Sequence, residues 1–222
     1  HLFIRRLMVM KYNPKPTFHE ELIAKNDGYF SIAGIDEVGR GPLAGPVVSA
    51  AVILDSSMCF SWISKIRDSK QLSHKRRVEI FDSIRSANIP YGIGIVSSSQ
   101  IDKMGIVEAT RKSMMNAVCD IGISPDFLLI DAMDLDNSGI KYKSIIKGDR
   151  KCLSIAAASL VAKVHRDSMM TEEDYNYPGY GFSQNKGYPT KFHMDRLREL
   201  GPTPIHRFSF APVRDISGMW YT

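Results

Sequence analysis

The feature that most constrains this chain is an alternation of two hydrophobic patterns from residue 31 onward. Short apolar runs rich in β-branched residues indicate buried strands, and segments with apolar residues at helical spacing indicate amphipathic helices. The strand-like runs are 31–36, 47–54, 91–98, 127–131 and 142–147. The helical patterns run from an N-cap at Ser73 to Ile84 and over 106–121, 153–170 and 190–200. Together they predict an α/β domain with a mixed sheet flanked by helices.

The chain is expected to hold one folded domain with an appendage at each end. Domains typically have about 100–200 residues, and this chain has 222. Residues 1–29 are polar and aperiodic and are interpreted as a leader lying on the domain. The alternating patterns occupy 30–189. Residues 190–222 are expected to form a helical extension, with a short helix to residue 200 followed by an irregular tail.

Charge and cysteine content narrow the class of protein. The 29 Lys and Arg residues exceed the 24 Asp and Glu residues, giving a formal charge of +5, which admits a polyanionic partner without requiring one. Cys59, Cys119 and Cys152 form no C-x-x-C pair, so neither a disulfide framework nor a zinc ribbon is indicated. Scattered thiols of this kind predict a reducing, cytoplasmic location.

No segment predicts insertion into a membrane or export. The longest uncharged stretch, 41–54, has 14 residues and contains two prolines, which is short of the roughly 20 apolar residues that a spanning helix needs. Arg5 and Arg6 stand where a signal peptide would need its apolar segment. We therefore expect no membrane partner and no export signal.

Acidic side chains fall at the ends of three predicted strands. Asp36 and Glu37 end the first strand, Asp131 ends the fourth, and Asp149 follows the fifth. Clustered carboxylates repel one another and raise each other's pKa, and a bound divalent cation offsets that repulsion. Oxygen ligands suit Mg²⁺ or Mn²⁺ better than zinc. These residues therefore indicate a metal site at one edge of the sheet.

A plainer interpretation of the same residues stays open. Asp favours turns, so each strand-end carboxylate taken alone is more often a turn residue. Neighbours on a regular strand also face opposite sides, so Asp36 and Glu37 reach one site only if the strand breaks there. Gly39 and Gly41, which follow them, are consistent with such a break.

The Gly39-Arg40-Gly41 segment has two interpretations as well. Glycines let main-chain amides approach a phosphate or sugar, and an intervening Arg pairs with phosphate. The alternative is a tight turn between strands with a solvated Arg. The segment is not a dinucleotide fingerprint, because the third glycine of that pattern is replaced by Ala44.

Basic and aromatic residues surround the acidic positions in the sequence. Residues 65–77 hold six basic residues and one acid, and 141–151 hold five basic residues and one acid. Each run is either a solvated face or a surface that binds a polyanion beside a metal site. Tyr188 belongs to an aromatic loop over 175–190, whose rings either pack internally or stack on a sugar or base.

Taken together, these blocks resemble bacterial ribonuclease HII, the type 2 ribonuclease H family. The matching segments are GIDEVGRGPLAGPVV (34–48), DSKQLS (68–73), LLIDA (128–132), KGD (147–149), SIAAASLVAKVHRD (154–167), YPGYGFSQNKGYPTKFH (177–193) and IHRFSFAPV (205–213). They occur in that order and span most of the chain. The resemblance implies a ribonuclease H-like fold over 30–189: a five-stranded mixed sheet flanked by helices, with a helical C-terminal extension.

The resemblance also implies roles for particular residues. The metal-binding, catalytic carboxylates are Asp36, Glu37, Asp131 and Asp149. The backbone of Gly39, Arg40 and Gly41 is expected to read the 2′-hydroxyl at the cleavage site. Tyr188 is expected to pack on the deoxyribose that follows the ribonucleotide, and Ser69 and Lys70 to contact the nucleic-acid backbone. Asn185 departs from the family, where a His is expected.

The activity implied is that of an endoribonuclease with two Mg²⁺ or Mn²⁺ ions. It would hydrolyse the RNA strand of RNA–DNA hybrids and nick duplex DNA on the 5′ side of an embedded ribonucleotide, leaving 3′-hydroxyl and 5′-phosphate ends. The tail, DISGMWYT (215–222), lacks a sliding-clamp motif, and no repeated apolar stripe indicates an obligate partner, so we expect a monomer. Only 35 residues precede Asp36, too few for the extra N-terminal domain of type 3 enzymes.

Two other classes of protein remain as alternatives. A junction resolvase or transposase-like nuclease would share the carboxylates without needing Gly39–Gly41 or Tyr188. A non-catalytic nucleic-acid-binding protein would be expected to have lost at least one of the four carboxylates, and all four are present.

Overall fold

The computed structural model describes residues 15–66 and 72–220 and contains the predicted five-stranded mixed sheet. Its strands are β1 (Ile32–Val38), β2 (Val47–Ile53), β3 (Tyr91–Val96), β4 (Phe127–Asp131) and β5 (Lys141–Ile145), in the spatial order β3-β2-β1-β4-β5. Strands β1, β2 and β3 pair antiparallel, whereas β4 pairs parallel to both β1 and β5. The carboxyl ends of β1, β4 and β5 therefore lie at the same edge of the sheet.

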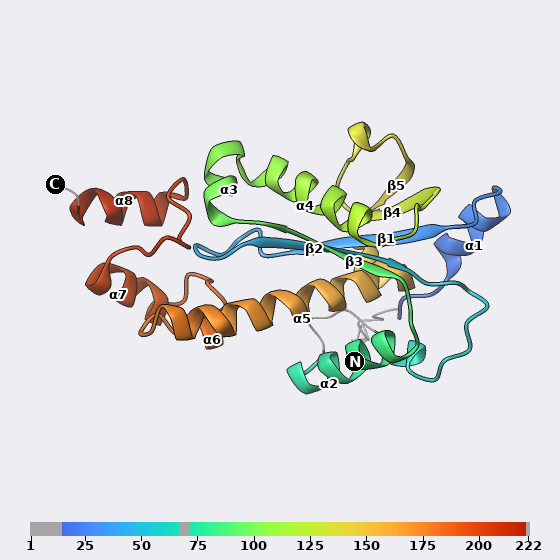
Figure 1. The fold of residues 1–222 in the computed structure, drawn as a ribbon, viewed down its shortest axis with the longest axis horizontal. Coiled ribbons are helices and arrows are strands. Elements are labelled where there is room, and N and C mark those ends of the chain that lie inside the picture. Colours follow the sequence, from blue (N-terminus) through green and yellow to red (C-terminus); the bar gives the residue numbers. More distant parts are fainter. Residues whose placement is uncertain (1–14, 67–71, 221–222) are drawn as a thin grey trace, which may run out of the picture.

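Helices cover both faces of this sheet (Figure 1). Helices α3 (Ser98–Met104) and α4 (Ile106–Asp120) lie over one face, and α5 (Leu153–Asn176) crosses the other, with α2 (His74–Ser86) beyond it. Helix α1 (His19–Asn26) lies at one end of the molecule. Helices α6 (Phe182–Asn185), α7 (Lys191–Leu200) and α8 (Ala211–Trp220) lie at the other end. Among residues 15–66 and 72–220, the short 3₁₀ turns are η1 (Ile63–Lys65), η3 (Asp136–Ser138) and η4 (Gly148–Arg150).

Successive residues of β1 face opposite sides of the sheet, so they contact different helices. Ala33 and Ile35 of β1 pack in one buried cluster with Met114 of α4. Gly34, which faces the opposite side, lies so close to α5 that a Cβ atom there would stand 2.2 Å from the main-chain carbon of Ser154. A glycine on the strand and the small residues of α5 thus bring this helix close to the sheet, directly beside the end of β1.

Helix α1 was not predicted, because residues 1–29 show no apolar periodicity. Its buried contact is polar instead: the Glu21 carboxylate accepts a hydrogen bond of 2.8 Å from the amide of Ser154, in the first turn of α5. Negative charge is favourable at that end of a helix. The described part of the segment 1–29, from residue 15 onward, therefore contains a helix whose Glu21 caps α5.

Two further differences from the predicted secondary structure concern helices α3 and α8, which were not predicted. The predicted third strand, 91–98, ends at Val96, because Ser97 caps α3 in a reciprocal arrangement with Gln100. The predicted irregular tail instead contains α8. Pro212 suggests a helix breaker in the sequence, but it stands in the first turn of α8, where its missing N–H costs nothing.

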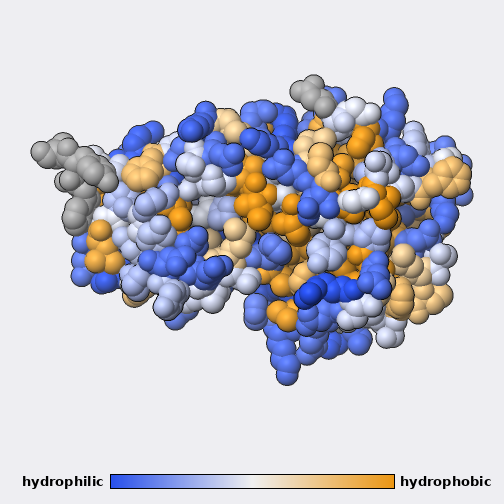
Figure 2. Space-filling view, in the orientation of Figure 1, coloured by the Kyte–Doolittle hydropathy of each residue, from blue (hydrophilic) through white to orange (hydrophobic). Residues whose placement is uncertain are grey.

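The distribution of hydrophobic and hydrophilic residues on the surface is consistent with this layered arrangement. Figure 2 shows hydrophobic residues gathered in the middle of one face, where the sheet lies between its helical layers, and hydrophilic residues over α2 at the lower margin. No helix in 15–66 or 72–220 has the length and apolar character needed to cross a membrane.

Candidate active site

The strand register brings two of the predicted carboxylates side by side. Ile35 of β1 pairs with Ile130 of β4, so the next residues, Asp36 and Asp131, lie level at the edge of the sheet. The expectation that Asp36 and Glu37 can reach one site only if β1 breaks there is wrong: β1 does not break, and yet the charge of Glu37 acts on Asp36. Asp36 and Glu37 remain paired with Ala50 and Ser49 of β2, because the antiparallel ladder continues to Val38 after the pairing with β4 has ended.

Asp36 is buried at this edge, with 5% of its surface exposed. Its Oδ1 accepts a hydrogen bond of 2.8 Å from the amide of Glu37. Burial raises the pKa of Asp36 well above its usual value, the carboxylates of Glu37 and Asp131 raise it further, and a hydrogen bond with Ser159 opposes them. Three carboxylates therefore share one electrostatic environment at the edge of the sheet.

Glu37 contributes an oxygen that has no partner in the described structure. Its Oε1 lies 3.5 Å from Nη1 of Arg40, whereas its Oε2 is buried without a hydrogen bond. Burial raises the pKa of Glu37, the positive charge of Arg40 lowers it, and Asp131 raises it. A buried carboxylate oxygen left without a donor is costly, and coordination to a cation would offset that cost.

Asp131 and Asp149 are joined through the main chain. The Oδ1 atom of Asp131 accepts a hydrogen bond of 2.7 Å from the amide of Gly148. Gly148 begins turn η4, which carries Asp149 with only 4% of its surface exposed. Ala132 and Lys147 both have positive φ angles, so a sharp main-chain turn follows β4 and another precedes η4.

The donor set fits Mg²⁺ or Mn²⁺. It offers carboxylate oxygens alone, one of them orphaned, and such ligands suit these cations. Among residues 15–66 and 72–220, no group of three or more His, Cys, Asp and Glu side chains forms a ready-made metal cage. Mg²⁺ is commonly held by one or two carboxylates together with waters and substrate phosphates, so an incomplete protein cage suits this ion.

The Gly39-Arg40-Gly41 segment follows β1 directly and reaches the surface beside these carboxylates. Gly39 is buried and has a φ of +96°, where a Cβ atom would also stand 2.3 Å from Nε of Arg166. Arg40 and Gly41 are exposed. The structure therefore supports a tight glycine turn, and it leaves main chain accessible at the sheet edge.

Tyr188 lies against this segment although it is far away in the sequence. A Cβ atom on Gly41 would stand 3.8 Å from the Tyr188 ring, which is 39% exposed. Behind the ring, a chain of imidazoles holds the main chain. His193 Nδ1 lies 2.9 Å from the carbonyl oxygen of Tyr188, and His193 Nε2 lies 3.1 Å from His206 Nε2.

The hydrogen bonds of these imidazoles define their protonation. The Thr203 amide donates to His206 Nδ1 at 2.9 Å, so the His206 proton is on Nε2 and is donated to His193 Nε2. His193 in turn donates from Nδ1 to Tyr188. Burial lowers the pKa of both histidines, that of His206 to about 3, so both are neutral near pH 7.

The aromatic residues of the segment 175–190 include both buried and exposed side chains. Tyr180 and Phe182 are buried and contact the rings of His193 and His206, so these two aromatics have the internal packing role. Tyr188 is left accessible beside Gly41. Ser69 and Lys70 lie outside the described residues.

Sequence reasoning missed several residues around the site. They are Ser159, Gly148, His193 and His206, together with Arg166 and Arg207. A buried main-chain donor such as Gly148 leaves no signal in the sequence. The histidines do occur within the quoted blocks, but only the fold shows that 193 and 206 meet.

Known proteins similar to this chain show the family to which it belongs. The family model described as Ribonuclease HII matches residues 33–213. This chain belongs to the ribonuclease HII family. The Ribonuclease HII of Enterococcus faecalis is 49% identical over 196 residues, which cover 88% of this chain and 75% of that protein.

Solved structures support the ribonuclease H-like fold. The ribonuclease H2 from Pyrococcus horikoshii OT3 has a TM-score of 0.72 at 24% identity, covering 86% of this chain and 99% of that one. The ribonuclease HIII named Bst-RNase HIII, solved in complex with Mn²⁺, has a TM-score of 0.66 at 19% identity, covering 90% and 73%. Membership of the ribonuclease HII family makes the chain a divalent-metal-dependent endoribonuclease that acts on RNA–DNA hybrids.

Proposed function

We propose that this member of the ribonuclease HII family also nicks duplex DNA on the 5′ side of a single embedded ribonucleotide, leaving 3′-hydroxyl and 5′-phosphate ends. The observation that supports this is the position of Tyr188 beside Gly41, next to the carboxylates at the edge of the sheet. A ring and an accessible main-chain segment placed together offer contacts to two consecutive sugars. A nuclease that cuts DNA alone needs neither.

In this proposal the main chain of Gly39, Arg40 and Gly41 recognises the 2′-hydroxyl, which is the group that distinguishes RNA from DNA. Tyr188 packs on the deoxyribose that follows, so the enzyme detects the junction between the two sugars. The Arg40 guanidinium, exposed beside Glu37, is placed to pair with a phosphate. The contacts of Ser69 and Lys70 with the nucleic-acid backbone also remain part of the proposal.

Asp36, Glu37, Asp131 and Asp149 are the proposed ligands of two Mg²⁺ or Mn²⁺ ions. Such a pair of ions activates the attacking water and stabilises the departing 3′-oxygen when bound. The part of the protein is to hold the carboxylates in place. The Gly148 amide donates to Asp131 and the Glu37 amide donates to Asp36, and the second bond opposes the rise in the pKa of Asp36.

We also propose that 30–189 is the catalytic domain and that one chain suffices for cleavage. The carboxylates, the glycine segment and Tyr188 all come from the same chain. The extension over 190–222 supports Tyr188 through His193 and His206. A monomer in the cytoplasm that acts on nucleic acid without a clamp is the simplest form of this proposal.

The test compares three 5′-labelled duplexes in Mg²⁺ and in Mn²⁺. One is DNA with a single ribonucleotide, one is an RNA–DNA hybrid, and one is all DNA. We expect cleavage of the first immediately 5′ of the ribonucleotide, cleavage of the hybrid, and an intact third duplex. Cleavage of the hybrid alone would remove the proposal about embedded ribonucleotides, and equal cutting of all-DNA would favour a resolvase-like nuclease.

A further inference from the structure

Two buried arginines bind the inner side of the loop that carries Gly39, Arg40 and Gly41. Arg166 of α5 and Arg207 of the C-terminal extension both have 0% of their surface exposed. Arg207 donates to the carbonyl oxygens of Gly39 at 2.5 Å and Arg40 at 2.9 Å, and also to that of Gly45. These contacts join the extension, over 160 residues away, to the proposed substrate-reading segment.

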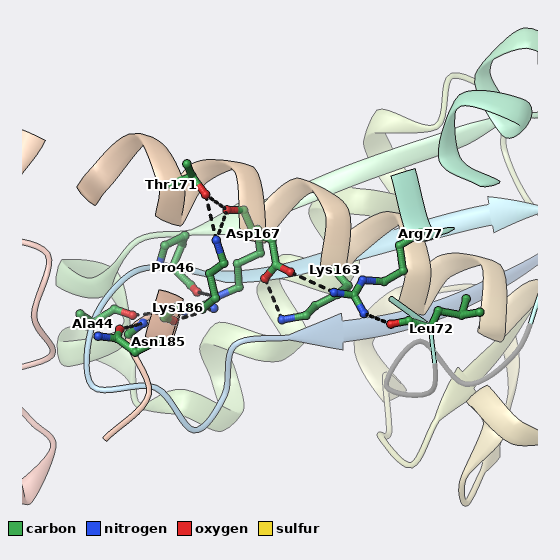
Figure 3. Close-up of polar contacts among 11 residues, drawn as sticks. Ala44, Pro46, Leu72, Arg77, Lys163, Asp167, Thr171, Asn185 and Lys186 are labelled. Atoms are coloured by element: carbon green, nitrogen blue, oxygen red, sulfur yellow. Dashed lines mark hydrogen bonds and ion pairs between the residues drawn. The ribbon is translucent and has the colours of Figure 1, made fainter. Parts of the chain in front are cut away.

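Arg166 binds the other half of the same loop. It donates to the carbonyls of Pro46 at 2.9 Å, Ala44 at 3.2 Å and Lys186 at 3.0 Å. The Lys186 contact ties the loop to the segment that precedes Tyr188. Figure 3 shows Ala44, Pro46 and Lys186 gathered at this point.

These guanidinium groups are bound to main-chain carbonyls rather than to carboxylates. The acid next to Arg166, Asp167, accepts from Lys163 at 2.7 Å and lies 3.6 Å from Arg77, so it is engaged elsewhere (Figure 3). Burial lowers the pKa of Arg166 to about 10. Burial, with the nearby charge of Arg166, lowers that of Arg207 to about 9, so both stay charged near pH 7. Two positive charges therefore lie behind the loop, where they favour an anion in front of it.

The carbonyl contacts fix the direction of the amides. The peptide bonds of the described chain are trans, and in a planar trans peptide the C=O and the following N–H point in opposite directions. Because Arg207 binds the carbonyls of Gly39 and Arg40, the N–H groups of Arg40 and Gly41 point away from the interior. Over 15–66 and 72–220, neither amide donates a hydrogen bond, and both residues are exposed.

We propose that Arg207 and Arg166 are positioning residues for substrate reading, which hold the loop of residues 39–46 from inside so that the Arg40 and Gly41 amides face the ribonucleotide. They touch no reacting atom and act through the loop. The inference deepens the proposed function, because the amides would meet the 2′-hydroxyl and its adjacent phosphate. It also gives the C-terminal extension a role in specificity.

The test uses Arg207→Lys and Arg166→Lys, with Arg198→Lys as the matched control because Arg198 is exposed on α7. A lysine keeps the charge but cannot bind several carbonyls in fixed directions. The first measurement is the NMR order parameter of the Arg40 and Gly41 amides in the protein without nucleic acid. We expect a fall from about 0.85 to below about 0.6 in Arg207→Lys and no change in the control. Unchanged order parameters would overturn the inference whatever the activity.

The second measurement is discrimination between sugars. For each variant, the affinity in EDTA is determined for a duplex with one ribonucleotide and for the same duplex in all-DNA form. We expect Arg207→Lys to lose about tenfold or more of the preference for the ribonucleotide while its affinity for all-DNA changes little. Equal loss for both duplexes would show a merely structural role. Should Arg207→Lys fail to fold, Arg166→Lys decides the question by the same two measurements.

Failure of the proposed function gives a different result. In that case the wild-type protein itself would bind both duplexes equally, while the order parameters would still report on the loop. Loop rigidity and the wild-type preference for the ribonucleotide are therefore measured separately, and either can be absent without the other.

Discussion

Asp131 accepts a hydrogen bond of 2.7 Å from the main-chain amide of Gly148, and this bond joins the end of β4 to the turn that carries Asp149. A Cβ atom on Gly148 would stand 2.6 Å from Cδ1 of Ile155, so a larger residue there would displace the Ile155 side chain. Two proposed metal ligands, one at the end of β4 and one in turn η4, are thus placed by one main-chain contact.

The first prediction concerns Asp131→Asn. The amide oxygen of Asn still accepts from Gly148, so the fold and duplex binding should persist, whereas loss of the charge should reduce cleavage by at least about a hundredfold. Single-turnover cleavage and thermal unfolding together check this. Asp134→Asn, on the exposed loop that follows β4, is the control and should cleave normally. Near-normal turnover in Asp131→Asn would mean that the carboxylate assignment is wrong.

The second prediction concerns Tyr188→Ala. Loss of a stacking ring should weaken binding at an RNA-to-DNA junction by about tenfold, with a smaller effect on all-DNA duplex. Fluorescence anisotropy with both duplexes measures the difference. Tyr188→Phe should keep most of the preference, and Tyr175→Ala is the control because Tyr175 is 88% exposed on α5. A uniform loss on both duplexes would argue against a sensing role.

The third prediction concerns stability in acid. Burial holds the pKa of His206 at about 3, below its ordinary value of 6.5. Between these values the unfolded chain binds a proton that the folded chain does not, so stability falls as the pH drops below about 6.5, by up to about 1.4 kcal/mol per pH unit for this group. Burial also lowers the pKa of His193, so its effect has the same sign.

Urea denaturation between pH 7.5 and pH 4.5 tests this prediction. His206→Asn is expected to be less stable near neutral pH but to lose less stability on acidification, because Asn does not titrate. His19→Gln, at an exposed position, should keep the wild-type slope. An unchanged slope in His206→Asn would show that the acid sensitivity comes from other groups.

The fourth prediction concerns the contact between β1 and α5. Gly34→Ala would bring Cβ to 2.2 Å from the main chain of Ser154, so α5 must shift, at a cost of about 3 kcal/mol or more. Thermal unfolding should show this as a clear fall in midpoint. Gly218→Ala is the matched control in α8, where no atom lies within 4 Å. There the same substitution should stabilise by about 0.5–1 kcal/mol.

Much of the sheet could be predicted from local patterns. Strands such as 127–131 are short apolar runs whose central residues are buried. Ser73 is the N-cap of α2, where its side-chain oxygen accepts a hydrogen bond from the Arg76 amide. Helix α1 could not be predicted in this way. Its position depends on Glu21 meeting the start of α5, and a contact between residues 133 positions apart leaves no local pattern.

The candidate site also combines features that could be predicted from the sequence with features that could not. The sequence by itself determined which residue types were available: four carboxylates at strand ends, a glycine turn around Arg40, and Tyr188 in an aromatic loop. Only the tertiary structure decided that Asp36 and Asp131 are level, that β1 runs on past Asp36, and that Tyr188 meets Gly41. The physical reason is that strand register and helix packing set these distances, and both depend on contacts between distant segments. Arg207 shows this most clearly, since in the sequence it is one basic residue among 29, and in the fold it orients the loop that follows β1.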